Sequence, residues 1–179
     1  MPRRKLEFVQ GEIYHLFNRG VDKSSIFVTS ENYFFFITKC WEYSRSLEIP
    51  ILAYCLMPNH YHLVVYQSGD EPAGKLVQLV CNSYSKAFNS LMNRTGTLFQ
   101  GRYRAKHVTS QSYLERVCAY VHANPVVAGL VPEPEYWPYS DFTRWMGMGI
   151  EGSSMRIHRE LGVILGQDYR HILEEVLAI

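Results

Sequence analysis

Apolar and polar residues follow two different periods along this chain of 179 residues, and the two periods alternate. Apolar residues at every second position, or in short β-branched runs, predict strands at residues 13–19, 51–56, 60–66 and 98–108. Apolar residues spaced three and four apart predict helices at residues 30–46 and 76–94. This β-α-β-β-α-β order is the ferredoxin-like plan of an α+β domain, whose first and third strands are neighbours at the centre of an antiparallel sheet.

Three further segments follow the predicted sheet. An additional helix starts near Thr109 or Ser110, and Pro125 should end it, because the residue before a proline disfavours helical geometry. Residues 125–142 are typical of an extended loop. A glycine-rich linker at 146–152 and a helical pair at 153–179 complete the chain. We therefore expect one domain at 1–145, and a linker with a C-terminal helical extension at 146–179.

Two histidines stand two positions apart in the predicted strand 60–66. His60 and His62 should lie on one face of the sheet, while Tyr61, Leu63 and Val65 enter the core on the other. Paired imidazoles on a rigid strand suit a divalent metal, although histidines packed in a core are common. His15 falls on the strand predicted beside this pair, and we interpret it as a packed histidine.

The additional helix carries a tyrosine and an asparagine one turn apart. Leu114, Cys118 and Val121 form its apolar stripe, and Tyr120 and Asn124 lie together on a neighbouring face. A phenol and an amide oxygen could therefore approach the histidine pair together. Taken alone, the helix favours an ordinary alternative, in which the tyrosine is half-buried in a core and the asparagine caps the helix.

Taken together, these segments resemble a known family, the single-tyrosine HUH transposases, and within it the REP-associated tyrosine transposases of the IS200-like type. The resemblance rests on four motifs in the family's order, residues 14–20 (YHLFNRG), 57–63 (MPNHYHL), 96–104 (GTLFQGRYR) and 120–131 (YVHANPVVAGLV). It spans about residues 10–142 and ends at WPYSDF, residues 137–142. Val127 stands where many relatives carry a basic residue, which puts a DNA contact at this position in doubt.

The resemblance implies a mechanism. His60, His62 and the side-chain oxygen of Asn124 would hold Mg²⁺ or Mn²⁺, although this ligand set also suits zinc. Tyr120 would attack the scissile phosphate of single-stranded DNA near a hairpin or palindrome, giving a 5′-phosphotyrosine and a free 3′-OH. The protein would then be a transposase that cleaves and rejoins DNA.

Two other functions fit the same fold. One is a catalytically inactive DNA-binding domain, although a decayed copy should have lost at least one of the four site residues. The other is a metal-dependent hydrolase without a covalent intermediate, which usually has a carboxylate base beside its metal. No acidic residue adjoins His60 or His62 in sequence, and Asp22 and Glu115 remain open as neighbours in the folded chain.

The charge distribution restricts where DNA can bind. The formal net charge is only +1, so any DNA contact must come from local patches. One candidate patch is a row of cations on the strand 98–108, which could contact the phosphates of DNA. An equal alternative is that this face of the strand is only exposed to solvent. A basic arm at the start of the chain and one cation in the first motif are further candidates. These residues are Arg102, Arg104 and Lys106; Arg3, Arg4 and Lys5; and Arg19.

The cysteines and the apolar runs of the sequence indicate where the protein is located. The four cysteines lie in scattered apolar contexts without a CxxC pair, which indicates free thiols in a reducing compartment. No uninterrupted apolar run reaches the length of about 18 residues that a membrane span needs, and the chain starts without an apolar signal segment. We therefore expect a cytoplasmic, nucleoid-associated protein without membrane contact, and favour a monomer over a dimer that exchanges its tyrosine helices.

Overall fold

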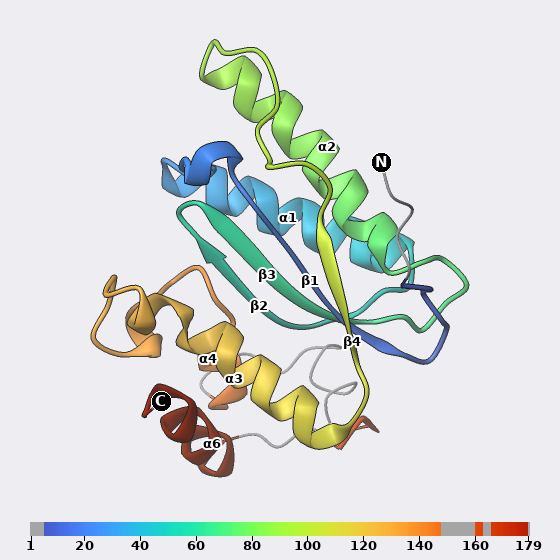
Figure 1. Ribbon diagram of the computed structural model, residues 1–179, viewed down its shortest axis with the longest axis vertical. Coiled ribbons are helices and arrows are strands. Elements are labelled where there is room, and N and C mark those ends of the chain that lie inside the picture. The colour runs from blue at the N-terminus through green and yellow to red at the C-terminus, as the bar shows by residue number, and fades with distance from the viewer. Residues whose placement is uncertain (1–5, 148–159, 163–165, 179) are drawn as a thin grey trace.

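The computed structural model describes residues 6–147, 160–162 and 166–178. A four-stranded sheet runs through its centre (Figure 1). The strands are β1 (Ile13–Arg19), β2 (Ile51–Met57), β3 (His60–Tyr66) and β4 (Arg104–Val108). The helices are α1 (Ser30–Ser46), α2 (Gly74–Leu91), α3 (Gln111–Val127), α4 (Phe142–Trp145) and α6 (Gln167–Leu177), with short 3-10 turns at Val21–Lys23 and Pro134–Tyr136.

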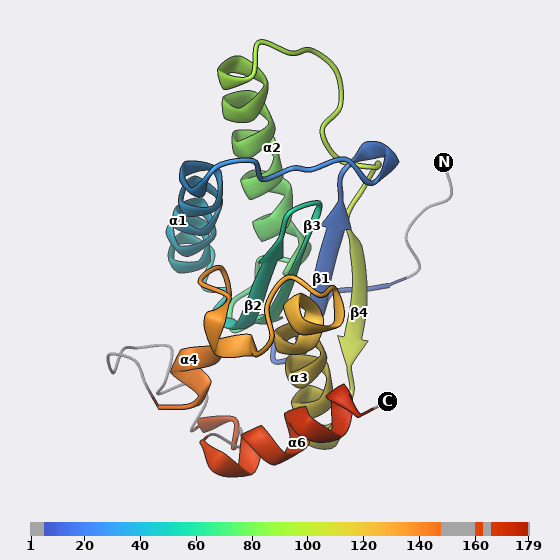
Figure 2. The ribbon, with the colours of Figure 1, turned by 90° about the vertical axis from the view of Figure 1, so that its left-hand side faces the viewer.

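The strand order confirms the ferredoxin-like plan. The order is β2-β3-β1-β4, so β1 and β3 are the central neighbours, and all three pairings are antiparallel. Helices α1 and α2 cover one face of the sheet, and α3 lies across the other, with α6 beside it (Figures 1 and 2). None of the helices in the described ranges is both long and apolar enough to cross a membrane.

Each face of the sheet has its own hydrophobic cluster. Tyr61, Leu63 and Val65 are fully buried in the cluster that faces α1 and α2, as the alternation of strand β3 predicted. The opposite cluster combines Val64 and Cys55 of the sheet with the apolar stripe of α3. Because neighbouring residues of β3 enter opposite clusters, the direction of each histidine on this strand is fixed by its neighbours.

The fourth strand is shorter than the sequence pattern predicted. It begins at Arg104 rather than at residue 98, because Gly101 adopts a φ of +75° that breaks the extended run. Residues 98–100 instead bond to the end of β1, where Gln100 N–H donates to the Arg19 carbonyl at 2.8 Å. Tyr103 then lies so close to Gly74 that a β-carbon added to this glycine would meet the tyrosine hydroxyl oxygen at 1.7 Å.

Helix α3 continues through Pro125, so the prediction that this proline ends the helix was wrong. Pro125 has no N–H for the Val121 carbonyl four residues earlier. The side-chain amide of Asn124 donates to this carbonyl at 3.4 Å and to the Tyr120 carbonyl at 2.6 Å. These bonds partly replace the missing backbone bond, and the helix reaches Val127. The predicted N-terminal cap is confirmed, since Ser110 Oγ accepts from the Tyr113 N–H at 3.2 Å.

Other boundaries differ from the predictions by a few residues. Helix α2 spans Gly74–Leu91 instead of residues 76–94, whereas α1 has the predicted bounds and is capped by Thr29. The region 125–142, predicted as an extended loop, contains the end of α3 and the turn Pro134–Tyr136. The predicted linker and the first part of the predicted helical pair lie largely outside the described residues, so the domain boundary at residue 145 stays a prediction.

A buried polar network joins α3 to the segments that follow it. His122 Nε2 lies 2.9 Å from Asp141 Oδ1, and His122 Nδ1 lies 2.5 Å from the Tyr169 hydroxyl of α6. Asp141 Oδ1 also accepts from the Tyr54 N–H at 2.7 Å, which ties the network to strand β2. The side chains of His122 and Asp141 are almost fully buried. The network therefore fixes α3 between the sheet and α6.

We predict that Asp141→Ala lowers the free energy of unfolding by about 2–4 kcal/mol. The change leaves the buried His122 ring nitrogen and the Tyr54 backbone N–H without their shared acceptor. Urea denaturation followed by circular dichroism measures the loss. Asp70→Ala is the matched control, since Asp70 is exposed and its removal should cost less than about 0.5 kcal/mol. Equal stability of the two variants would contradict the role given to the network.

Candidate active site between the central strands and helix α3

The histidine pair lies on the face of β3 that α3 covers. The rings of His60 and His62 are 5.1 Å apart between centroids and perpendicular to each other. The register of the central strands places Arg19 opposite His60 and Phe17 opposite His62. His62 is buried and His60 is partly exposed, so the pair forms the wall of a site that opens at one end of β3.

Helix α3 brings Tyr120 to this pair. Leu114, Cys118 and Val121 pack into the cluster between helix and sheet, as their spacing predicted. Tyr120 consequently lies on the flank of the helix, 49% exposed, with its ring edge-on to His62 at 5.6 Å between centroids. A tyrosine within an ordinary core would be covered, whereas this side chain is half open to solvent beside two imidazoles.

Asn124 lies one turn beyond Tyr120 and meets the other histidine. Its side-chain nitrogen donates to the Tyr120 carbonyl, and its side chain also hydrogen-bonds to His60. His60 Nδ1 is held in turn by the Asn59 side chain at 2.6 Å. Tyr120 therefore adjoins His62 while Asn124 adjoins His60, so the four residues singled out from the sequence are brought together.

The surroundings of the histidines favour their neutral forms. Burial lowers the pKa of His62 well below its usual value, and His15, His60 and Lys106 lower it further. Burial and then Arg19 lower the pKa of His60, although its hydrogen bond to Asn124 acts in the opposite direction. A neutral imidazole keeps a lone pair for a metal or a proton. Burial therefore favours the form of both rings that can bind a cation.

A third histidine, His15, predicted to be packed in the core, also contacts the pair. His15 Nε2 lies 2.9 Å from His62 Nδ1, and the two rings are stacked at 5.1 Å. Burial, followed by the charge of Lys106, lowers the pKa of His15 to about 4. The signal in the sequence was its position on the strand next to the histidine pair, but only the register shows that His15 reaches His62.

The two histidines could hold a divalent cation only together with the side-chain amide of Asn124. Among the described residues, no three His, Cys, Asp or Glu side chains are grouped in a way that would hold a metal ion. His60, His62 and the side-chain oxygen of Asn124 are the donors on this face that could hold such an ion, while His15 Nε2 lies against His62 Nδ1. Imidazole and amide ligands suit several divalent metals, so the donors fit such an ion without identifying it.

The predicted row of three cations is only partly present. Arg104 and Lys106 are exposed and lie opposite Phe17 and His15, so both point to the face that carries the histidines. Arg102 precedes the shortened strand and lines a cavity against α2 instead, so its placement on the same face was wrong. The arm of Arg3, Arg4 and Lys5 lies outside the described residues.

A small cavity adjoins the histidine pair. It has a volume of about 160 Å³, and Phe17, Arg19, His60, Gln100 and Arg104 contribute to its lining. Arg19 Nε donates to the Gln100 side chain at 2.5 Å, so this guanidinium is held at the rim. Two cations thus face a hollow at the open end of β3, where a phosphate group could approach the histidines.

The site contains few negative charges. The charged groups that shift the pKa values of the three histidines are Lys106 and Arg19, and no carboxylate of the described residues is among them. Asp22 lies in the turn after β1 with a left-handed φ of 51°, and Glu115 lies in the first half of α3. Neither gives the histidines the acidic partner that a water-activating hydrolase usually has.

Comparison with solved structures shows the same fold in another protein. The structure of a REP-associated tyrosine transposase bound to a REP hairpin matches with a TM-score of 0.68 at 18% identity, over 85% of this chain and 89% of that one. A candidate transposase from Deinococcus radiodurans R1 matches with a TM-score of 0.47 at 12% identity, over 72% of this chain and 98% of that one. A search of curated proteins found no significant match.

The sequence itself matches one family model, described as "Transposase IS200 like", over residues 9–124. This range runs from before the first strand to the asparagine of the site, and so contains the histidine pair, Tyr120 and the whole sheet. Because the match covers more than half of the chain, this protein belongs to the IS200-like transposase family.

Proposed function

We propose that this transposase cleaves and rejoins single-stranded DNA through a covalent bond to Tyr120. The observation that carries the proposal is the half-exposed Tyr120 ring, edge-on to buried, neutral His62 and one helical turn from Asn124. A nucleophile must be accessible, and the groups that stabilise the transition state must be fixed. The site meets both requirements, because Tyr120 faces solvent while the histidines are locked in the sheet.

The chemical step is a transesterification. The Tyr120 oxygen bonds to the phosphorus, and the bond from phosphorus to the 3′ oxygen of the preceding nucleotide breaks. The proton lost by the phenol equals the one gained by the 3′ oxygen, so a 5′-phosphotyrosine and a free 3′-OH result without any other reactant. Because one ester replaces another, a second DNA end can reverse the step and rejoin the strand.

His60, His62 and Asn124 would hold Mg²⁺ or Mn²⁺ at this site. Such an ion polarises a phosphate oxygen and stabilises developing charge. His15 would orient His62, since its hydrogen bond to His62 Nδ1 leaves Nε2 as the nitrogen of this ring that could bind the ion. Ligand histidines usually have such a partner on their second nitrogen, which fixes the ring and its tautomer.

Arg104, Lys106 and Arg19 would guide the DNA backbone to this site. Cations position a nucleic acid through its phosphates without reading its bases. The structural relative was solved with a REP hairpin, which supports a hairpin beside the cleaved strand as the substrate here. We further propose that the protein acts as a nucleoid-associated monomer, in which Tyr120 serves the His62 of its own chain, since the two rings lie 5.6 Å apart between centroids.

Tyr120→Phe should abolish the covalent adduct but leave DNA binding nearly unchanged, because only the hydroxyl is nucleophilic. The assay incubates the protein with a hairpin oligonucleotide that has single-stranded flanks, in the presence of Mg²⁺ or Mn²⁺, and resolves adducts on a denaturing gel. Tyr136→Phe is the control, since Tyr136 is also exposed but lies outside the site. An adduct from the Tyr120 variant would exclude this residue as the nucleophile.

Metal affinity should fall in a graded way across the site. We expect His60→Ala and His62→Ala to remove most Mn²⁺ binding, and Asn124→Ala to weaken it less, because an amide oxygen is a weaker ligand than an imidazole. His15→Ala should lower the affinity by roughly 10–100-fold through the loss of ring orientation. Calorimetric titration with Mn²⁺ measures these effects without DNA.

The control for this series is His107→Ala, because His107 lies on β4 but stacks on Tyr14 and contacts Glu12 away from the site. This variant should bind Mn²⁺ as the parent protein does. If His62→Ala also retained the parent affinity, the paired-imidazole site would be refuted.

Replacing Arg104 and Lys106 with alanine should weaken binding to single-stranded DNA and flatten its dependence on salt. Each lost phosphate contact lowers the slope of log affinity against log salt by about 0.7 for a single strand. Dissociation constants over a salt series test this. The double variant of Lys39 and Arg45 removes the same charge from α1, and its slope should match that of the parent. An unchanged slope for the first variant would show that its face is only solvated.

A further inference from the structure

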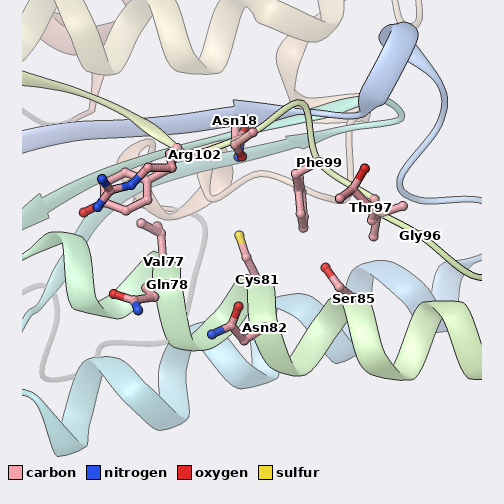
Figure 3. A pocket seen from close by; sticks show the side chains of 13 residues that line it. Asn18, Val77, Gln78, Cys81, Asn82, Ser85, Gly96, Thr97, Phe99 and Arg102 are labelled. Carbon is pink, nitrogen blue, oxygen red and sulfur yellow. The ribbon is translucent and has the colours of Figure 1, made fainter. Parts of the chain in front are cut away.

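A second cavity, larger than the one beside the histidines, lies on the opposite face of the sheet. Its volume is about 470 Å³, within the range typical of small-molecule sites. One wall is α2, and the other is the loop of residues 96–103 that leads into β4 (Figure 3). The proposed reaction at Tyr120 uses none of the side chains that line this wall of α2.

The walls of this cavity have different chemistry. Val77 and Leu98 are buried apolar residues of its lining. The Phe99 ring points from the loop toward α2 (Figure 3). Gln78, Asn82 and Ser85 recur at intervals of four and three residues along α2, so they share one face of the helix. The cavity thus combines an aromatic, apolar interior with a row of hydrogen-bonding side chains. Thr97 and Arg102 add a hydroxyl and a guanidinium from the loop.

The cavity adjoins the active-site hollow through a shared wall. Asn18, near the end of β1, lines both cavities. Its side-chain nitrogen donates to the Gly101 carbonyl at 3.1 Å, and the adjacent Gln100 bonds back to Arg19. The loop is therefore anchored to the strand that carries His15. A DNA strand at the rim of the active-site hollow needs to cross only this loop to reach the second cavity.

We propose that the cavity binds one unpaired nucleotide of the DNA substrate, with its base inside and its phosphate at Arg102. An aromatic ring beside apolar side chains suits the face of a base, and amides and hydroxyls suit its hydrogen-bonding edge. An aliphatic ligand would leave the polar row on α2 without partners. The proposal rests on the proposed function for its substrate, and adds a place where this substrate is recognised away from the cleaved bond.

Two variants of α2 test the proposal. Ser85→Phe fills the cavity, and Ser90→Phe places the same ring on α2 at an exposed position outside it. Both are combined with Tyr120→Phe, so that binding is measured without cleavage. The probe is a hairpin oligonucleotide with single-stranded flanks, in which each unpaired position in turn is replaced by an abasic site. Thermal unfolding checks that both variants remain folded.

One abasic position should weaken binding to the parent protein by roughly ten-fold, the scale of one stacked base. Ser85→Phe should weaken binding to intact DNA to a similar extent, and the same abasic position should then have no further effect. Ser90→Phe should keep the parent pattern. The proposal is overturned if the penalty at every position is the same in Ser85→Phe as in the parent.

A second, milder variant tests the proposal in case Ser85→Phe does not fold. Asn82→Ala together with Gln78→Ala should reduce the penalty at the same abasic position, and an unchanged penalty would count against the proposal. The covalent adduct formed by the protein with intact Tyr120 is measured separately. If no adduct forms but the loss of affinity at the abasic position still depends on the cavity, only the cleavage proposal is refuted. If the adduct forms but this loss is the same in the cavity variants as in the parent, only the nucleotide cavity is refuted.

Discussion

The antiparallel register between β1 and β3 is the constraint on which the rest of the structure depends. It places His15, Phe17 and Arg19 on the same face as His62 and His60, while Tyr14 and Leu16 enter the opposite core. A slip of one residue would turn every side chain of one strand to the other face. The burial of large apolar residues on the far face therefore holds the three imidazoles together.

Helix α3 completes the site because two different interactions hold it. Its apolar stripe packs on the sheet, and His122 joins it to Asp141 and Tyr169 in a buried network. The face next to the stripe is thereby turned toward the histidines, with Tyr120 half exposed. The local repair of the helix at Pro125 uses the side chain of Asn124, so the residue proposed as a metal ligand also maintains the helix.

The two faces of the sheet would have separate tasks in DNA processing. The face covered by α3 has neutral imidazoles, exposed cations and an accessible phenol, which suit phosphate chemistry. The face covered by α2 has an aromatic cavity with amide side chains, which suits a base. The end of β1 and the loop after residue 96 connect them, so a change in this loop should affect both.

Much of this protein follows from local sequence. Alternation in β3 determined which side of the sheet carries His60 and His62, and the stripe of α3 placed Tyr120 and Asn124 on one flank, because strand and helix periods are fixed by the backbone. The sequence did not reveal the contact of His15 with His62, the partners of His122 or the true start of β4. Those features depend on strand register, on contacts between distant segments and on the left-handed turn at Gly101. Only the tertiary structure decides them, because no local pattern records which residues meet across the fold.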